Sequence, residues 1–272
     1  MAALLAKARA RPLVLTEHGI YTKERRIELL QASWIQDDEP DAGPSASIGF
    51  IRQLWIRFFE AIGRMTYAAS DPVVTLFEGN RERQIQDGAA PERTRVIPNG
   101  IDVRRFAPLR ARRAEEVPPV LALVGRVVPI KDVKTFVRAA RIVCTEMPEA
   151  EAWIVGPEDE DPTYALECRD LVRSLGLEGK VKLLGHQQVE DVYPRIGLNV
   201  LTSVSEAQPL VVLEGFAAGV PCVASDVGSC RELVEGAREE DRALGSAGEI
   251  VGIADPTATA RLAYHIARNY PP

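Results

Sequence analysis

Short apolar runs alternate with amphipathic helical patterns from Pro118 onward, and this alternation restricts the fold more than any other feature of the chain. Strands that alternate with helices are typical of βαβ units and a parallel sheet. The runs predict strands at 119–125, 151–156, 180–185, 198–203, 221–225 and 249–252. Residues 111–272 are therefore predicted to form a Rossmann-like, doubly wound α/β domain.

The segments between these strands have helical periodicity. Residues 132–146 place Val133, Phe136, Val137 and Ala140 on one stripe, which predicts a helix packed against the sheet. Further helices are predicted at 164–174, 189–193, 209–218 and 230–234, and another begins after residue 256.

The chain before Pro118 has a thinner pattern. Strands are predicted at 13–16, 72–76 and 94–100, and helices at 47–67 and 80–87, with a short amphipathic helix before the first strand. A polar break contains Pro40 and Pro44. A nucleotide-binding α/β domain usually has about five or six strands. Residues 1–110 are therefore predicted to be a partial Rossmann-like domain, and the charged stretch 108–119 is predicted to be the linker.

Composition restricts the classes of protein that remain. The 272 residues are 46% apolar, enough for a sizeable core. The net charge is −6 and the cations are scattered among acids, which argues against an extended nucleic-acid face. The apolar runs fall short of the roughly 20 residues of a membrane span. The start of the chain, which carries Lys7, Arg9 and Arg11, lacks the apolar stretch of a signal peptide.

The four cysteines are Cys144, Cys168, Cys222 and Cys230. They lie far apart and form no C-x-x-C pair, which argues against a zinc site or a disulfide framework. Reduced, mostly buried thiols in a cytoplasmic protein are expected.

Two cations follow the strand that ends at Gly125. Arg126 comes next, and Lys131 lies just before the following helix. Loops at the carboxyl ends of parallel strands form the ligand crevice, and helix N-termini there favour anions. A guanidinium and an ammonium at this position would suit a diphosphate. The spacing is equally compatible with two ordinary surface cations.

The segment "SEAQPLVVLEG" follows another strand end. Glu206 lies in the loop, Pro209 suits the first turn of a helix, and Glu214 lies on that helix. Two carboxylates beside the amides of 207–210 could hold the diols of a sugar nucleotide. Alternatively, Glu206 is a first-turn charge that the helix dipole favours, and Glu214 faces water.

The remaining candidate groups are histidines and an acidic run. His18 and His186 each follow a strand, and His265 lies in the last helix; a structural role is favoured for the latter two. Asp159 and Asp161 have D-x-D spacing that could hold Mg²⁺, although a solvated acidic loop is favoured. Neither G-x-G-x-x-G nor a P-loop motif occurs, which disfavours a nicotinamide oxidoreductase.

Several motifs together resemble the retaining glycosyltransferases of family 4. These are "VIPNGID" (96–102), "GRVVPIKD" (125–132), "LLGH" (183–186), "SEAQPLVVLEGFAAGVP" (205–221) and "SDVGSCRELVEG" (225–236). The resemblance implies the GT-B architecture, which has two Rossmann-like domains, with acceptor side 1–110 and donor side 111–272. No metal and no cofactor are implied, since the nucleotide sugar is a substrate.

A narrower resemblance is to the subgroup that serves Pel-type exopolysaccharide synthesis (PelF-type). It rests on "LTEHGIYTKERRIELLQASWI" (15–35) and "LFEGNRERQIQDGA" (76–89), with "SEAQPL" and "VGSCREL". It implies UDP-glucose as the donor, a growing polysaccharide as the acceptor, and a cytoplasmic enzyme that partners an inner-membrane synthesis and export complex.

The resemblance also implies roles for individual residues. Arg126 and Lys131 would neutralise the diphosphate, and Glu214 would bind the ribose. Catalytic roles fall to Glu206, which would hold the hexose, and to His18, which would reach it from the other domain. The donor is further contacted by Ala207, Gln208, Pro209 and Leu210 at the phosphate and by Gly185 and His186 at the base.

This sequence departs from the family pattern in two respects. Ala207, Gln208 and Pro209 replace the Gly-Phe that commonly follows the first glutamate. Relatives also carry longer stretches at both ends, so this chain is expected to lack the first strands and the glycine-rich loop of the acceptor domain. A catalytically incomplete, nucleotide-sugar-binding fragment is therefore the alternative. A UDP-sugar epimerase shares the architecture, but the paired glutamates disfavour it.

Overall fold

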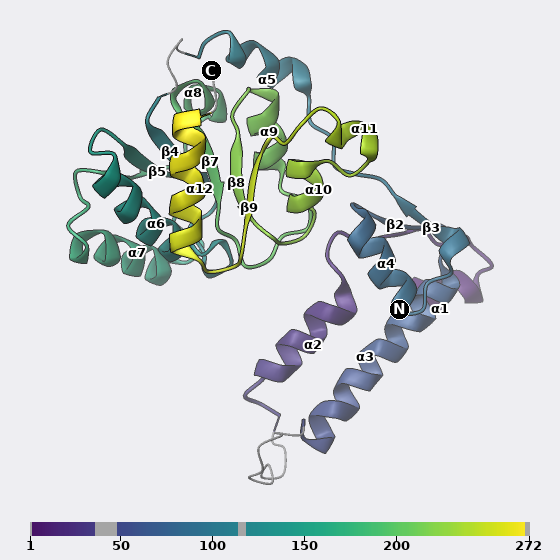
Figure 1. Cartoon of the computed structure of the whole chain (residues 1–272). Helices are drawn as coiled ribbons and strands as arrows, with labels where there is room; N and C mark the ends of the chain where they lie inside the picture. The colour runs from purple at the N-terminus through teal and green to yellow at the C-terminus, as the bar shows by residue number, and fades with distance from the viewer. Residues whose placement is uncertain (1, 36–47, 114–117, 270–272) are drawn as a thin grey trace. The chain divides into compact units, whose positions relative to one another are not determined.

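The computed structural model describes residues 2–35, 48–113 and 118–269 (Figure 1). The chain divides into two compact units, Met1–Pro98 and Asn99–Pro272. The division falls closer to the N-terminus than the predicted boundary after residue 110. The prolines of the polar break, Pro40 and Pro44, and residues 114–117 of the predicted linker lie outside the described residues.

The described part of Asn99–Pro272 contains a parallel sheet of six strands in the order β6-β5-β4-β7-β8-β9. Its strands are β4 Val120–Val124, β5 Glu151–Val155, β6 Val181–Gly185, β7 Leu198–Leu201, β8 Cys222–Ser225 and β9 Gly248–Val251. All six predicted strands are confirmed within one or two residues at each end. The chain order reverses between β4 and β7, and ligands bind beyond the carboxyl ends of strands at such a switch point.

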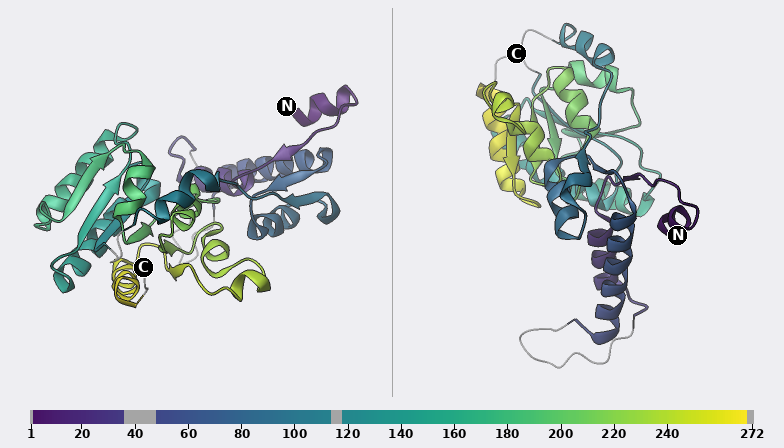
Figure 2. Two further views of the ribbon diagram at one scale, coloured as in Figure 1. Left: turned by 90° about the horizontal axis from the view of Figure 1, so that it is seen from above. Right: turned by 90° about the vertical axis from the view of Figure 1, so that its right-hand side faces the viewer.

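Helices cover both faces of this sheet, as the alternation along β4 shows. Leu121 and Leu123 join one apolar cluster, whereas Ala122 and Val124 join another. The first cluster includes side chains of α6 Val133–Glu146, α7 Pro162–Ser174 and α12 Pro256–Asn269. Helix α12, yellow in Figures 1 and 2, packs against α6. The second cluster includes side chains of α5 Val103–Arg110, the 3-10 helix η3 Tyr193–Arg195 and α9 Leu210–Ala217.

Helix α5 corrects the predicted linker. Residues 108–110 belong to the helix rather than to a linker, and α5 packs against α9. The Asp102 side chain caps α5 by accepting a hydrogen bond from the Arg104 amide at 3.1 Å. Phe106 and Leu109, one turn apart, are buried and hold α5 to its own unit, although Pro108 lies inside the helix.

The shorter elements of Asn99–Pro272 complete the loops between strands. They are the 3-10 helix η2 Pro129–Lys131 and the helices α8 Val189–Val192, α10 Cys230–Glu235 and α11 Glu239–Arg242. Cys168, Cys222 and Cys230 are buried free thiols, and burial raises the pKa of Cys168 to about 11.

Met1–Pro98 contains a parallel sheet of three strands in its described residues, in the order β1-β2-β3. The strands are β1 Leu15–Thr16, β2 Val73–Thr75 and β3 Thr94–Val96; the helices are α1 Ala2–Ala8, α2 Tyr21–Gln31, α3 Phe50–Ala69 and α4 Glu78–Gln86, with the 3-10 helix η1 Pro91–Arg93. Helices α2 and α3 lie side by side (Figure 1). The structure adds α2, for which no helix was predicted.

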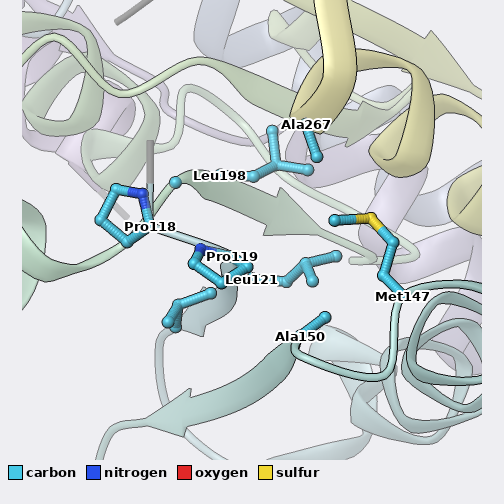
Figure 3. A pocket seen from close by; sticks show the side chains of 9 residues that line it. Pro118, Pro119, Leu121, Met147, Ala150, Leu198 and Ala267 are labelled. Atoms are coloured by element: carbon cyan, nitrogen blue, oxygen red, sulfur yellow. The ribbon is translucent and has the colours of Figure 1, made fainter. Parts of the chain in front are cut away.

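A small apolar cavity lies where β4 and β7 begin (Figure 3). Its lining includes Pro118, Leu121, Met147, Leu198 and Ala267, and its volume is about 10 Å³. That space holds about one water molecule at most. It lies at the amino ends of the strands, whereas ligands of such sheets bind beyond the carboxyl ends.

Candidate functional site

The loops after β4 and β7 are bonded to each other at the switch point. The Thr202 hydroxyl lies 3.0 Å from the carbonyl oxygens of both Lys131 and Asp132, and the Val204 amide donates to the Ile130 carbonyl at 2.9 Å. Thr202 is buried. These hydrogen bonds hold the two loops in a fixed position relative to each other, so that side chains from both can meet.

Lys131 and Glu206 meet above these loops. The Lys131 Nζ lies 2.5 Å from the Glu206 Oε1, and the two side chains are 19% and 12% exposed. The hydroxyl of Ser203 donates to the same oxygen at 2.6 Å. The structure therefore brings together a cation and a carboxylate that the sequence placed 75 residues apart.

The loop after β8 supports the backbone that carries Glu206. Gly228 has φ +56°, and a Cβ there would lie 2.4 Å from the Glu206 carbonyl oxygen and 2.5 Å from that of Ala207. The Ser229 amide donates to the Ala207 carbonyl at 2.9 Å. The motif "SDVGSCRELVEG" contains Gly228 but does not by itself indicate this contact.

Gln208 is held by a residue that the sequence analysis also left out. The Asn99 amide donates to the Gln208 Oε1 at 2.5 Å, and the Asn99 side chain donates to the Gln208 carbonyl at 3.2 Å. Pro209 is buried and is the N-cap of α9, one residue before the helix starts at Leu210. The motif "PNG" was the only signal for Asn99.

Glu214 lies on α9, one turn into the helix, and is partly buried. Burial raises its pKa, and the nearby carboxylate of Glu190 acts in the same direction. The Tyr193 hydroxyl, which donates to the Glu214 Oε2 at 3.3 Å, and the charge of Arg105 lower the pKa in part. A carboxylate in this setting favours a partner that donates hydrogen bonds.

The other predicted donor residues do not take part in the contact between Lys131 and Glu206. Arg126 is half-exposed and forms an ion pair with Glu160 of the acidic run. Gly185 ends β6 with φ +64°, and His186 after it is exposed. Asp161, one of the two candidate metal ligands, instead caps α7 by accepting from the Tyr164 amide at 2.9 Å.

His18 lies in the other unit, in the loop between β1 and α2. Its side chain is exposed, and its carbonyl accepts a hydrogen bond from the Asn80 side chain at 2.8 Å. The neighbouring Glu17 accepts bonds from the Tyr67 hydroxyl and the Gln84 amide, each at 2.9 Å. The carbonyl of His18 and the side chain of the residue before it are thus both held by hydrogen bonds.

The parallel sheet with helices on both faces makes this an α/β protein. One cation and two carboxylates on the loops and helix at its switch point suit a phosphorylated, hydroxyl-rich ligand. The family described as glycosyl transferases group 1 matches residues 118–269, and a domain of unknown function, DUF3492, matches residues 1–92. Since the first match covers more than half of the chain, the protein belongs to the group 1 glycosyl transferases.

Two curated relatives illustrate the similarity. The chain is 32% identical over 210 residues to the D-inositol 3-phosphate glycosyltransferase of Kineococcus radiotolerans, covering 71% of this chain and 47% of the relative. It is 31% identical over 246 residues to the protein of the same name from Kribbella flavida, covering 85% and 54%. The chain thus spans about half the length of the curated relatives it matches.

A solved structure shows the fold. Anabaena HepE (Alr3699), in complex with UDP and glucose, matches with a TM-score of 0.71 at 21% identity, covering 98% of this chain and 65% of HepE. The predicted α/β, GT-B-like fold is confirmed. Separately, none of the helices in the described ranges is both long and apolar enough to cross a membrane.

Proposed function

We propose that the protein binds a nucleotide-sugar donor at the switch point of Asn99–Pro272 and serves retaining transfer of a hexose. The contact between Lys131 and Glu206, beside the N-terminus of α9, carries this proposal. It places one cation and one carboxylate beside the first amides of a helix, which is what a sugar diphosphate requires.

Each part of the donor has a group to receive it. Lys131 and Arg126 neutralise the diphosphate, and the backbone of 207–210 contacts the phosphate next to the sugar. Glu206 holds the hexose, Glu214 the ribose, and the turn at Gly185 and His186 the base. In the free protein Lys131 is already paired with Glu206. The diphosphate therefore competes with Glu206 for the ammonium, which leaves the carboxylate able to accept from sugar hydroxyls.

The chemistry that follows is positional and electrostatic. The leaving diphosphate takes the proton of the acceptor hydroxyl as that oxygen attacks from the same face of the sugar, so the configuration is retained. Charge that builds on the leaving oxygen is stabilised by Lys131 and by the amides at the start of α9. His18, from the acceptor-side domain 1–110, contacts the transferred hexose in the complete site.

We propose UDP-glucose as the donor and a growing Pel-type exopolysaccharide as the acceptor. The quoted segments 15–35 and 76–89 support the subgroup, and both lie inside the match to DUF3492. The complex of HepE with UDP and glucose supports the donor by analogy of fold. The enzyme would work in the cytoplasm, at the inner membrane through the partners that export the polymer.

A nucleotide-sugar-binding fragment without transfer activity is the second candidate. The observation that favours it is coverage, since the match spans only 47% and 54% of the two curated relatives. The two candidates share the donor site and differ only in turnover.

An assay of nucleotide release separates the two candidates. The chain is incubated with UDP-glucose, with and without an acceptor glucan or amino-sugar oligosaccharide, and free UDP is measured. Release that depends on the acceptor supports the transferase, and product with retained anomeric configuration completes the case. Tight binding of UDP-glucose without release in any mixture favours the fragment. His18→Ala should abolish acceptor-dependent release while it leaves unchanged the binding of UDP, which lacks the hexose.

A further inference from the structure

The hydroxyl of Tyr193 donates hydrogen bonds to helix α9. The residue is fully buried in η3, just before β7, and its ring packs edge-on against Phe106 at 6.2 Å between centroids. Its hydroxyl lies 3.0 Å from the Val211 carbonyl and 3.3 Å from the Glu214 Oε2. One proton is therefore shared between a backbone oxygen and a carboxylate.

The first of these bonds has a second support. The Asn199 side chain on β7 also donates to the Val211 carbonyl, at 3.0 Å. The backbone of α9 would thus stay anchored if the hydroxyl were removed, whereas the carboxylate of Glu214 would lose its donor.

The two oxygens of Glu214 are unequal. Oε2 accepts from Tyr193, while within the described ranges no hydrogen bond ends on Oε1. The charged groups that face this carboxylate are Arg105 from α5 and Glu190 from α8, which are bonded to each other. A carboxylate with one oxygen fixed and the other open presents a defined direction to a hydroxyl donor.

We infer that Tyr193 is a positioning residue that orients Glu214 to accept the hydroxyls of the nucleotide ribose. This inference rests on the proposed donor site. The ring of Tyr193 fills the core and its hydroxyl sets the rotamer of Glu214, so the two roles can be separated by removing the oxygen alone. A preorganised acceptor loses less conformational entropy when a ligand binds. The resulting gain in affinity is restricted to ligands that donate a hydrogen bond to it.

The experiment compares UDP with 2′-deoxyuridine diphosphate by calorimetry on the full chain. The wild type should bind UDP more tightly than the deoxy nucleotide, and Tyr193→Phe should reduce that ratio of affinities by roughly three- to tenfold, as expected for the loss of one typical hydrogen bond. Affinity for the deoxy nucleotide should change little. Tyr164→Phe, which removes a hydroxyl from a buried tyrosine on α7, is the matched control and should keep the wild-type ratio.

Each outcome decides one point. If the wild type binds neither nucleotide, or binds both equally, the ribose role of Glu214 is wrong and the inference fails with it. If the wild type discriminates and Tyr193→Phe discriminates as well, only the inference is wrong. Equal weakening of both nucleotides in Tyr193→Phe would mean that the hydroxyl supports the fold alone, which also overturns the inference.

Discussion

At the scale of single residues, the candidate site contains groups that are costly to the fold. Glu214 is a carboxylate whose pKa is raised by burial first and by Glu190 second. A raised folded-state pKa means that the folded protein favours the protonated form. The stability associated with protonated Glu214 is then fully present below the pKa of the unfolded glutamate. It is lost as the pH rises through the higher pKa of Glu214 in the folded protein.

Glu214→Gln should therefore stabilise the free protein at neutral pH while it weakens nucleotide binding. The gain in melting temperature over the wild type should shrink as the pH falls toward about 4 and should be absent below it, where the glutamate is protonated in both the folded and the unfolded protein. Thermal unfolding across this range measures the effect, with the exposed Glu146→Gln as control. A variant less stable than wild type at neutral pH would show that the ionised carboxylate contributes to the fold.

Gly228 supplies a second prediction at this scale. Gly228→Ala forces a side chain against the carbonyls of Glu206 and Ala207. The substitution should cost about 1–3 kcal/mol of stability and displace the loop that carries Glu206. Affinity for UDP-glucose should fall with it. Gly176→Ala is the control, since Gly176 has φ +68° but a Cβ added there would meet no atom within 4 Å, so only the backbone strain remains. Equal nucleotide affinity in both variants would contradict the support assigned to Gly228.

At the scale of elements, Phe106 tests whether α5 belongs to the donor unit. The side chain is buried against Tyr193, and α5 packs on α9. Phe106→Ala should lower the free energy of unfolding by about 3–5 kcal/mol. Val103→Ala, on the exposed side of the same helix, should change it little. Urea denaturation of both variants gives the comparison, and a similar small loss in each would show that α5 is not held by this core.

The elements that could be predicted are those whose pattern is set by burial. Strands such as Val120–Val124 are covered on both faces, so nearly every residue is apolar and the run is easy to see. Helix α2 could not be recognised, because its segment "YTKERRIELLQ" is mostly polar and buries only Thr22 and Leu29. Helix α5 was hidden by Pro108, which usually marks the end of a helix.

In the site, too, some residues could be predicted from local sequence pattern and others could not. Lys131, Glu206 and Glu214 could be placed at one edge of the sheet, because each follows a strand of a parallel sheet. The contributions of Gly228, Asn99 and Tyr193 depend on contacts between loops far apart in sequence. Nothing local in "DVGS", "PNG" or "VYP" indicates that a glycine touches one carbonyl or that a hydroxyl reaches one carboxylate.

At the scale of the whole molecule, the chain combines two units that differ in the evidence for their function. Asn99–Pro272 has the six-stranded sheet, the switch point and the family match within its described residues. Met1–Pro98 contributes His18, held by its backbone next to the buried network of Glu17. Donor binding is therefore expected from Asn99–Pro272 alone, and the proposed role of His18 in transfer is the part of the proposed function that involves Met1–Pro98.

Calorimetric titration of UDP-glucose into the wild type, Lys131→Ala and Lys134→Ala tests the donor site most directly. Lys134 is the matched control, because it lies one turn away on α6 and pairs with Glu167 instead of Glu206. The wild type and Lys134→Ala should bind alike, and Lys131→Ala should bind about 10-fold or more weakly, as a lost charge-assisted contact of about 1.5–3 kcal/mol predicts. Equal affinity in all three proteins, or no binding to the wild type, would contradict the donor site proposed at the switch point.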